Sequence, residues 1–325
     1  MIGNRWVVRW LATFGPALLF ALAGCTTGRQ ARPALQTYLQ RLGFESIALE
    51  RDNHNHLLAP AELNGKRRLL LVDTGWSLTT VDRSVGRKLP TLGELSGGVS
   101  DPRMARFYGT SAVLVASLKL GGAVFTNQAA RVESLRVNSM DGVLGCDFLL
   151  RHHGVIDCLD QRLYLRDKAP SPELQGALEA TLRRSGFHPV KLDLQPSLVS
   201  TCNAQVNGLP VKLVVDTGAQ TSIFDSSQVP RLGLKPVGTR VTIFGAVDRI
   251  HPARLAVADI KALELNGLTL THLHFGVAAM GDWGIRASGW SANEVQGVLG
   301  GYDLALAGAL IDCEHFTLWL KPVGK

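Results

Sequence analysis

Short apolar runs alternate with turn residues along most of the chain. Representative runs are LLLVD at 69–73, SAVLVASLKL at 111–120 and VKLVVD at 211–216, and Asn-Gly or Gly-Gly pairs separate such runs. Runs of this length, rich in β-branched and aliphatic residues and bounded by turn pairs, are typical of strands and hairpins. The pattern therefore predicts an all-β chain. Short helices are also expected at residues 33–42, 146–151, 172–185 and 302–307.

The pattern is present twice. YLQRLGFESIAL at 38–49 matches TLRRSGFHPVKL at 181–192, which begins 143 residues later, and LLLVDTG matches KLVVDTG at the same offset. Farther along, DGVLGCDFLLRHHGVIDC at 141–158 matches QGVLGGYDLALAGALIDC at 296–313, which begins 155 residues later. A single duplication, with about ten residues inserted into the second copy, accounts for these matches.

The two copies define the expected domain organisation. We expect an N-terminal lobe at residues 25–166, a linker at 167–177 and a C-terminal lobe at 178–325. The linker region contains DKAPSPELQ, which is rich in proline and polar residues. Because one chain carries both copies, we expect the protein to work as a monomer rather than as a dimer of two chains.

A lipoprotein signal peptide is predicted at residues 1–24. Two arginines precede the apolar run LATFGPALLFALAG, which is short for a membrane span and ends directly before Cys25. Leu-Ala-Gly-Cys resembles the bacterial lipobox, whose cysteine is acylated and becomes the new N-terminus. By resemblance to enterobacterial lipoproteins, Thr26 favours the outer membrane. We therefore expect a lipid anchor in a bacterial cell envelope, facing the periplasm; a signal peptide cut elsewhere and an uncleaved anchor helix are the alternatives.

Composition and charge narrow the function only slightly. The 325 residues are 46% hydrophobic and 19% charged, which is ordinary for a globular protein. The net charge of +7 is not concentrated in Lys/Arg blocks interleaved with aromatic residues, so no nucleic-acid partner is expected. The cysteines after Cys25 lack CxxC pairs and histidines at metal-ligand spacing, so no zinc site is expected, and their disulfide pairing is left open. They are Cys146, Cys158, Cys202 and Cys313.

Each copy carries Asp-Thr-Gly directly after an apolar strand, with the aspartates at Asp73 and Asp216. A single such tripeptide could simply be a turn that closes a strand. Two of them at equivalent positions of a duplicated chain favour a chemical role. Two carboxyl groups about 3 Å apart cannot both ionise easily, so one becomes an acid and the other a base. Such a pair can deprotonate a water and protonate an amide without a covalent intermediate.

These motifs resemble those of the retropepsin and pepsin aspartic proteases, and most of all the bacterial retropepsin-like proteins. The resemblance rests on the two Asp-Thr-Gly turns and on VLGCDFL at 143–149 and VLGGYDL at 298–304, each followed by a strand ending in Ile-Asp-Cys. It implies a two-lobed, all-β fold with a few short helices. It also implies an endopeptidase that uses Asp73 and Asp216 on extended peptide or protein substrates, with no cofactor and no metal.

The resemblance also assigns supporting roles to the residues beside the aspartates. Gly75 and Gly218 are expected to let the two turns approach closely. Thr74 and Thr217 are expected to hydrogen-bond to the opposite loop and hold the carboxyl groups in place. These four residues would support the geometry and take no part as acid or base.

Substrate-binding positions are expected next to the turns and in flaps above them. Trp76 and Ala219 stand where pepsins carry Ser or Thr. Loss of that hydroxyl donor should raise the lower pKa of the pair and extend activity toward neutral pH. Trp76 departs from the usual small residue and should alter the pocket on its side. The flaps are expected at residues 97–109 and 241–252, with Phe244 and Gly245 at the tip of the second.

Other polar residues have simpler explanations. His152 and His153 are expected at a solvated helix end rather than at a metal, because adjacent helical residues point to different faces. Asp157 and Asp312 precede cysteines at equivalent strand positions, where structural hydrogen bonds are expected. The rival to a protease is a non-catalytic peptide-binding lipoprotein that keeps the fold, with Trp76 filling the cleft.

Overall fold

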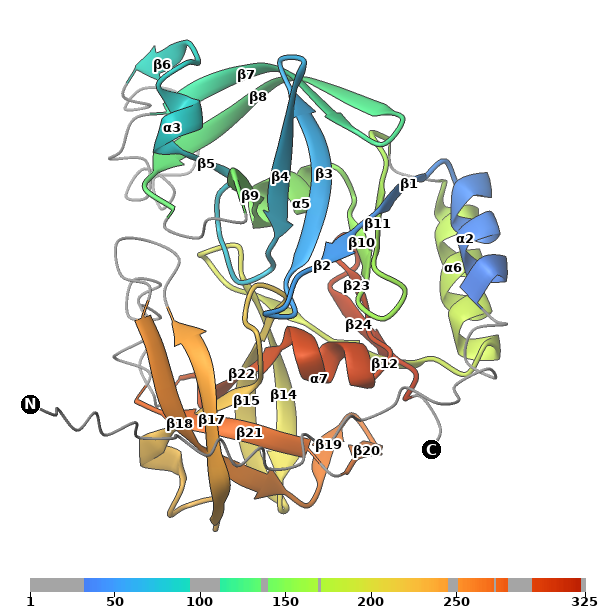
Figure 1. The fold of residues 1–325 in the computed structure, drawn as a ribbon. Helices are drawn as coiled ribbons and strands as arrows, with labels where there is room; N and C mark the ends of the chain where they lie inside the picture. Colours follow the sequence, from blue (N-terminus) through green and yellow to red (C-terminus); the bar gives the residue numbers. More distant parts are fainter. Residues whose placement is uncertain are drawn as a thin grey trace, which may run out of the picture.

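The computed structural model describes residues 32–93, 112–135, 140–168, 171–244, 251–271, 273–279 and 294–322. Their strands form three sheets. In Figure 1 the sheet of the first copy lies at the top and that of the second at the bottom, and a third sheet lies between them. This arrangement confirms the two-lobed, all-β fold expected from the sequence.

The sheet of the first copy closes on itself. Its strand order is β2-β3-β4-β9-β5-β8-β7-β6, and an additional pairing joins β3 to β7. The β4–β9 and β5–β8 pairs are parallel, so the Asp-Thr-Gly strand β4 lies beside β9, the strand of the VLG motif. The bounds are β2 Glu50–Arg51, β3 Leu57–Leu63, β4 Lys66–Val72, β5 Thr80–Asp82, β6 Thr91–Gly93, β7 Ala112–Leu120, β8 Ala123–Glu133 and β9 Gly142–Leu144.

The sheet of the second copy repeats this arrangement. Its order is β17-β18-β21-β16-β22-β15-β14-β19-β20, and β13 also pairs with β14. The β15–β22 and β16–β21 pairs are parallel, and β19 pairs with β14 as β7 pairs with β3. The bounds are β13 Asp193–Leu194, β14 Ser200–Val206, β15 Leu209–Asp216, β16 Ile223–Asp225, β17 Pro236–Phe244, β18 His251–Ile260, β19 Leu263–Leu265, β20 Leu268–Leu270, β21 Leu273–Ala278 and β22 Gly297–Gly300.

The third sheet is built from both copies. Its order is β1-β11-β10-β23-β24-β12. At its centre β10 and β23 pair antiparallel, with Ile156 opposite Ile311. These two isoleucines are equivalent in the repeat, so the pairing is symmetric and the lobes share a backbone ladder. The bounds are β1 Glu45–Ala48, β10 Val155–Asp157, β11 Arg162–Leu165, β12 His188–Lys191, β23 Leu310–Asp312 and β24 Thr317–Leu320.

Two helices pack on the shared sheet and lie side by side in Figure 1. Leu39 of α2 and Leu182 of α6 belong to one buried cluster with Tyr164 and Trp319 of the sheet. The four expected helices are confirmed to within one residue at each end. The bounds are α2 Arg32–Arg41, α3 Arg83–Gly86, α5 Cys146–Arg151, α6 Pro172–Arg184, α7 Gly301–Leu306 and the 3₁₀-helix η1 Ser226–Gln228.

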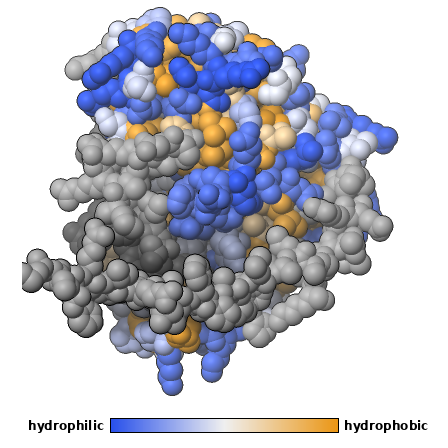
Figure 2. Space-filling view, in the orientation of Figure 1, coloured by the Kyte–Doolittle hydropathy of each residue, from blue (hydrophilic) through white to orange (hydrophobic). Residues whose placement is uncertain are grey.

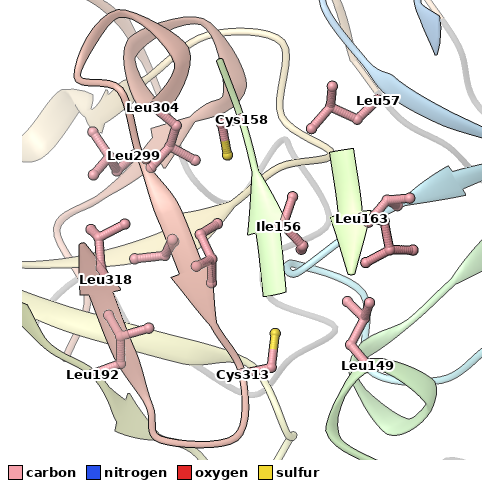
Figure 3. Packing of buried hydrophobic residues seen from close by; sticks show 14 of the residues in the cluster. Leu57, Leu149, Ile156, Cys158, Leu163, Leu192, Leu299, Leu304, Cys313 and Leu318 are labelled. Atoms are coloured by element: carbon pink, nitrogen blue, oxygen red, sulfur yellow. The ribbon is translucent and has the colours of Figure 1, made fainter. Parts of the chain in front are cut away.

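The largest buried cluster runs through both lobes and the shared sheet. Figure 3 shows Leu57 and Leu149 of the first copy, Ile156 at the centre, and Leu299 and Leu318 of the second. Protein interiors are close-packed, so a continuous core of this kind holds its parts in one arrangement. The core thereby fixes the relative positions of the strands that carry the two aspartates.

The predicted linker and the cysteines can also be located. Residues 169–170 of the predicted linker lie outside the described residues, and α6 begins at Pro172, within the predicted linker. The described part of the chain contains four cysteines, all buried and with no disulfide between them.

The last features to describe are the surface of the protein and the location of the predicted lipid anchor. Hydrophilic residues cover most of the described surface that Figure 2 presents, with smaller hydrophobic areas between them. No helix among the described residues is both long and apolar enough to cross a membrane. The predicted signal peptide and Cys25 lie outside the described residues.

Candidate active site

The two Asp-Thr-Gly turns follow equivalent strands. Asp73 comes directly after β4, and Asp216 is the last residue of β15. Each strand has the VLG strand of its own lobe as a parallel neighbour. Because both strands are paired on each side within their sheets, the sheets fix the backbone from which each carboxyl group projects.

Four hydrogen bonds join the two turns across the lobes. Thr74 Oγ1 donates to Val215 O at 2.8 Å, and Thr217 Oγ1 donates to Val72 O at 2.7 Å. Each hydroxyl also accepts: Thr74 N–H donates to Thr217 Oγ1, and Thr217 N–H donates to Thr74 Oγ1, both at 3.1 Å. Both threonines are buried, where an unmade bond would be costly. The structure therefore ties Thr74 and Thr217 together in the manner that the sequence motifs imply.

Each carboxyl group lies over the glycine of the opposite turn. A Cβ built on Gly75 would lie 2.5 Å from both carboxyl oxygens of Asp216, and one built on Gly218 would overlap the carboxyl group of Asp73. Only glycine leaves the room that this approach needs. The two carboxyl groups lie close enough to interact, since Asp216, by its negative charge and by a side-chain hydrogen bond, is among the causes that raise the pKa of Asp73.

The surroundings of Asp73 and Asp216 shift the pKa values of the two carboxyl groups by different amounts. Burial and then the negative charge of Asp216 raise the pKa of Asp73 well above its usual value. Burial also raises the pKa of Asp216, but hydrogen bonds from Asp73 and from two backbone N–H groups oppose that rise. These donors are Gly218 N–H at 2.8 Å and Ala219 N–H at 3.0 Å. Backbone N–H groups oppose the rise at Asp73 as well, among them Gly75 N–H at 2.8 Å, so the two carboxyl groups titrate as a pair in which the pKa of Asp73 is raised the more strongly.

The VLG motifs hold the loops that follow the turns. A Cβ on Gly145 or Gly300 would overlap the backbone of the loop beyond its own Asp-Thr-Gly turn. The helix that follows each glycine then supplies a carboxylate to the same loop. The two hydrogen bonds run from Thr79 N–H to Asp147 Oδ1 at 2.6 Å and from Ser222 N–H to Asp303 Oδ2 at 3.2 Å.

Trp76 packs against its own lobe. Its Nε1–H donates to Thr80 Oγ1 at 2.9 Å, and its ring packs against a buried cluster that includes Leu58 and Met140. The side chain is partly exposed. This placement leaves Trp76 as a wall beside the first turn. Ala219, at the equivalent position of the second lobe, contributes its N–H to Asp216.

Only part of the expected flaps lies among the described residues. The region 97–109 lies outside them. In the second lobe β17 and β18 pair antiparallel, and the pairing ends with Phe244 opposite His251. Phe244 therefore ends β17, while Gly245 lies outside the described residues.

Two expectations about polar residues have different outcomes. A solvated helix end is wrong for His152, which is buried between Phe125 and Phe148 with Nδ1 3.0 Å from Asp167 Oδ1. Burial lowers the pKa of His152. The helix pattern alone could not reveal that strand β8 covers this helix end. The structural role of the two strand aspartates is confirmed: Asp157 accepts from Leu159 N–H and Asp160 N–H, and Asp312 from Glu314 N–H and His315 N–H.

Sequence reasoning missed one loop that lies against the site. The β2–β3 loop at residues 52–56 reaches the second lobe, where Asn55 Nδ2 donates to Gln220 O at 3.4 Å. Burial raises the pKa of Asp216, and His56 of this loop is among the neighbours that oppose the rise. The alignment of the two copies could have drawn attention to this loop. DNHNH at 52–56 is aligned with QPSLV at 195–199, so the loop has histidines in the first copy and none in the second.

Comparisons with known proteins found a matching family model and similar solved structures. The family model described as aspartyl protease matches residues 202–301, which span the second Asp-Thr-Gly turn and the second VLG strand. The chain is similar to the aspartyl proteases. Among solved structures, the aspartic proteinase from Irpex lacteus is 12% identical, with 86% of this chain and 98% of that chain covered and a TM-score of 0.48. No curated protein matches this chain.

Proposed function

We propose that the protein is an aspartic endopeptidase that cleaves peptide bonds with a water activated by Asp73 and Asp216. The observation that supports this most strongly is the contact of the two carboxyl groups, each lying over the glycine of the opposite turn. A purely structural pair would gain nothing from this contact, since a buried carboxyl pair costs stability.

The proposed mechanism follows from the unequal protonation of the pair. Asp216, the more readily ionised group, takes a proton from a water that attacks the peptide carbonyl carbon. Asp73 donates its proton to the carbonyl oxygen, which gives a neutral tetrahedral diol. Collapse of the diol breaks the C–N bond as Asp216 gives its proton to the leaving nitrogen and Asp73 takes a proton from a diol hydroxyl, which restores the starting state of the pair. The threonine hydrogen bonds hold both carboxyl groups in place through these steps.

The substrate proposed for the site is an extended peptide or protein. The buried threonines lie on one side of the carboxyl groups, so substrate would approach from the other side, with Trp76 beside the first turn. No cofactor is proposed for the reaction, because the carboxyl pair supplies both an acid and a base.

Cleavage of a denatured protein mixture tests the proposal. Wild-type protein and Asp216→Asn are incubated with the mixture over a range of pH, and new termini are identified by mass spectrometry. We expect internal cleavage by the wild type and none above background by the variant. Equal cleavage by both proteins would contradict the proposal.

The rival function is peptide binding without cleavage. In that case the wild type would retain peptides but generate no new termini. The indole contact with Thr80 and the packing of Trp76 on its own lobe speak against a cleft filled by this residue. We therefore rank cleavage above binding alone.

We also propose that the protein is a monomer and that a lipid at Cys25 anchors it in a bacterial envelope, facing the periplasm. Metabolic labelling with a fatty acid tests the lipid anchor. Labelling is expected for the wild type and absent for Cys25→Ala. Acylation of the variant would contradict the lipobox assignment. Sedimentation with activity measured across the fractions tests the monomer, and activity confined to a dimer fraction would contradict it.

A further inference from the structure

The β2–β3 loop gathers three potential metal ligands. Asp52, His54 and His56 each place one ligand atom within 4.8 Å of the other two. Asn55, with φ of 66°, turns the chain between the two histidines. This turn brings His54 and His56 to the same side, with their ring centroids 6.0 Å apart.

The ligand atoms lie near the spacing that one metal ion requires, and His56 Nδ1 and Asp52 Oδ2 are also within hydrogen-bond distance of each other. His56 Nδ1 lies 3.0 Å from Asp52 Oδ2, and His54 Nδ1 lies 3.8 Å from the same oxygen. Ligand atoms bound 2.0–2.2 Å from a tetrahedral zinc lie about 3.4 Å from one another. Small ring rotations would therefore bring all three atoms onto one ion.

The carboxylate is already oriented by the backbone. Asp52 Oδ1 accepts from His54 N–H at 2.8 Å and from His56 N–H at 2.9 Å. These bonds leave Oδ2 directed at the imidazoles. Arg51 contacts the loop through Asn55, donating to its main-chain O at 3.1 Å and to its side-chain Oδ1 at 2.7 Å. Such supporting hydrogen bonds are the usual surroundings of a metal ligand.

The second lobe provides a natural comparison, because its β13–β14 loop has the same backbone. Leu198 has φ of 67°, and Gln195 N–H donates to Val199 O as Asp52 N–H donates to His56 O. This loop carries Gln-Pro-Ser-Leu-Val and none of the three ligands. The turn therefore folds without histidines, so turn formation does not explain Asp52, His54 and His56.

We propose that Asp52, His54 and His56 form a binding site for a transition-metal dication, with Zn²⁺ as the probe. Two imidazoles and one carboxylate are ligands that zinc accepts, and three protein ligands leave a coordination position open. His54 is 40% exposed at its side chain, so an ion would reach the site from solvent.

The position of the site suggests what an ion there would influence. Asn55 donates to Gln220 O in the loop after the second turn, and its own carbonyl oxygen lies near Gly301. A bound ion would therefore stiffen a contact between the first lobe and the loop that carries Ala219. The inference goes beyond the proposed proteolysis, since binding of the ion does not depend on activity.

Zinc titration of the full chain in competition with a chromophoric chelator tests the site. The expected result is one ion per wild-type chain above any weaker background binding, with the affinity lowered by ~tenfold or more in His54→Ala and His56→Ala. The control is His274→Ala, since His274 is an exposed histidine with a single acid, Asp259, 3.9 Å away. It should bind zinc like the wild type.

A second variant guards against misfolding. H54S/H56V gives the loop the residues of its counterpart in the second lobe, which keeps the same turn. It should fold like the wild type by circular dichroism and lose the tight ion. Absence of tight zinc binding by the wild type, or its persistence in H54S/H56V, would overturn the proposal. Because no substrate is used, a failure here is distinguishable from a failure of the proposed protease activity.

Discussion

The two lobes can be compared position by position, because equivalent strands carry the two Asp-Thr-Gly turns. At the turns they are nearly identical: the hydroxyl groups of Thr74 and Thr217 make matching hydrogen bonds, at 2.8 and 2.7 Å. One residue beyond the glycines they differ, since Trp76 packs against the first lobe while Ala219 donates its N–H to Asp216. The two lobes therefore have the same hydrogen bonds where the carboxyl groups meet, and they differ at the residues that follow the turn glycines.

This asymmetry has a chemical use in the proposed mechanism. Two carboxyl groups with identical surroundings would share a proton equally. Here each carboxyl group accepts an N–H from the glycine of its own turn, but Ala219 N–H gives Asp216 a further bond that favours its ionised form, and the neighbouring negative charge favours protonated Asp73. The differences between the lobes thereby distinguish an acid from a base.

The largest expected loss of activity comes from replacing the glycines of the two turns. In Gly75→Ala the new Cβ would collide with the carboxyl group of Asp216. A shift of the reacting groups by about 1 Å can lower the rate by about a hundredfold, so a loss of at least about that size is expected in kcat/KM. Gly218→Ala should behave alike, because it collides with Asp73.

The matched control for the glycines is Gly176→Ala in α6, where a Cβ would meet nothing within 4 Å. Activity should be unchanged, and the free energy of unfolding should rise by roughly 0.5–1 kcal/mol. Full activity in Gly75→Ala would show that the close approach of the turns is not needed.

The threonines test the symmetric part of the comparison. Thr217→Val leaves Thr74 N–H and Val72 O without their partner, and Thr74→Val leaves the equivalent groups of the other turn. Two buried unsatisfied groups should lower the free energy of unfolding by about 2–4 kcal/mol in either variant. Urea denaturation measures the loss, with exposed Thr126→Val as the control. A large loss in one variant alone would contradict the symmetry.

Trp76 tests the asymmetric part. Trp76→Ala makes the first lobe resemble the second at this position, so larger substrate side chains should be accepted beside the scissile bond. We expect a shift of about tenfold in relative kcat/KM toward such substrates, since pocket contacts of this size discriminate by about 1–3 kcal/mol. Cleavage sites in a peptide library measure the preference. An unchanged preference would remove Trp76 from the substrate-binding surface.

The smallest expected effect is the change in the free energy of unfolding caused by Asp73→Asn. Because the folded protein raises the pKa of Asp73, ionisation opposes folding above the ordinary carboxyl pKa of about 3.9 and has no effect well below it. Asp73→Asn removes this opposition, so the free energy of unfolding should rise at pH 7 by on the order of 1 kcal/mol and match the wild type near pH 3. Urea denaturation at both pH values checks the sign, and a less stable variant at pH 7 would contradict the raised pKa.

Much of the fold was predictable because the repeat fixes it. The offset between the copies located both Asp-Thr-Gly strands, and the helices expected at 33–42 and 172–185 correspond to α2 and α6. The alignment alone failed for Asp147 and Asp303, which stand one position apart in the repeat yet bind the equivalent loops. Both aspartates lie in the first turn of a helix, from which each reaches the loop of its own lobe, and the aligned sequences do not show this equivalence.

The sequence predicted the residues of the two turns at the candidate site, but not the loop of residues 52–56 that lies beside them. The motifs indicated the threonines and glycines, because their roles follow from two turns meeting. The contact of Asn55 with Gln220 joins residues 165 apart in the chain, and neither belongs to a recognisable motif. The burial of His152 has the same origin, since it depends on Phe125 of a distant strand.

The central claim is that Asp73 and Asp216 act as one unit, and a double-mutant comparison tests it most directly. kcat/KM is measured on one peptide for Asp73→Asn, Asp216→Asn and the double variant. Residues that act as a unit have non-additive effects, so each single variant should lose about a thousandfold or more and the double variant should be little worse than either. Substantial activity in both single variants, or losses that multiply in the double variant, would contradict the account.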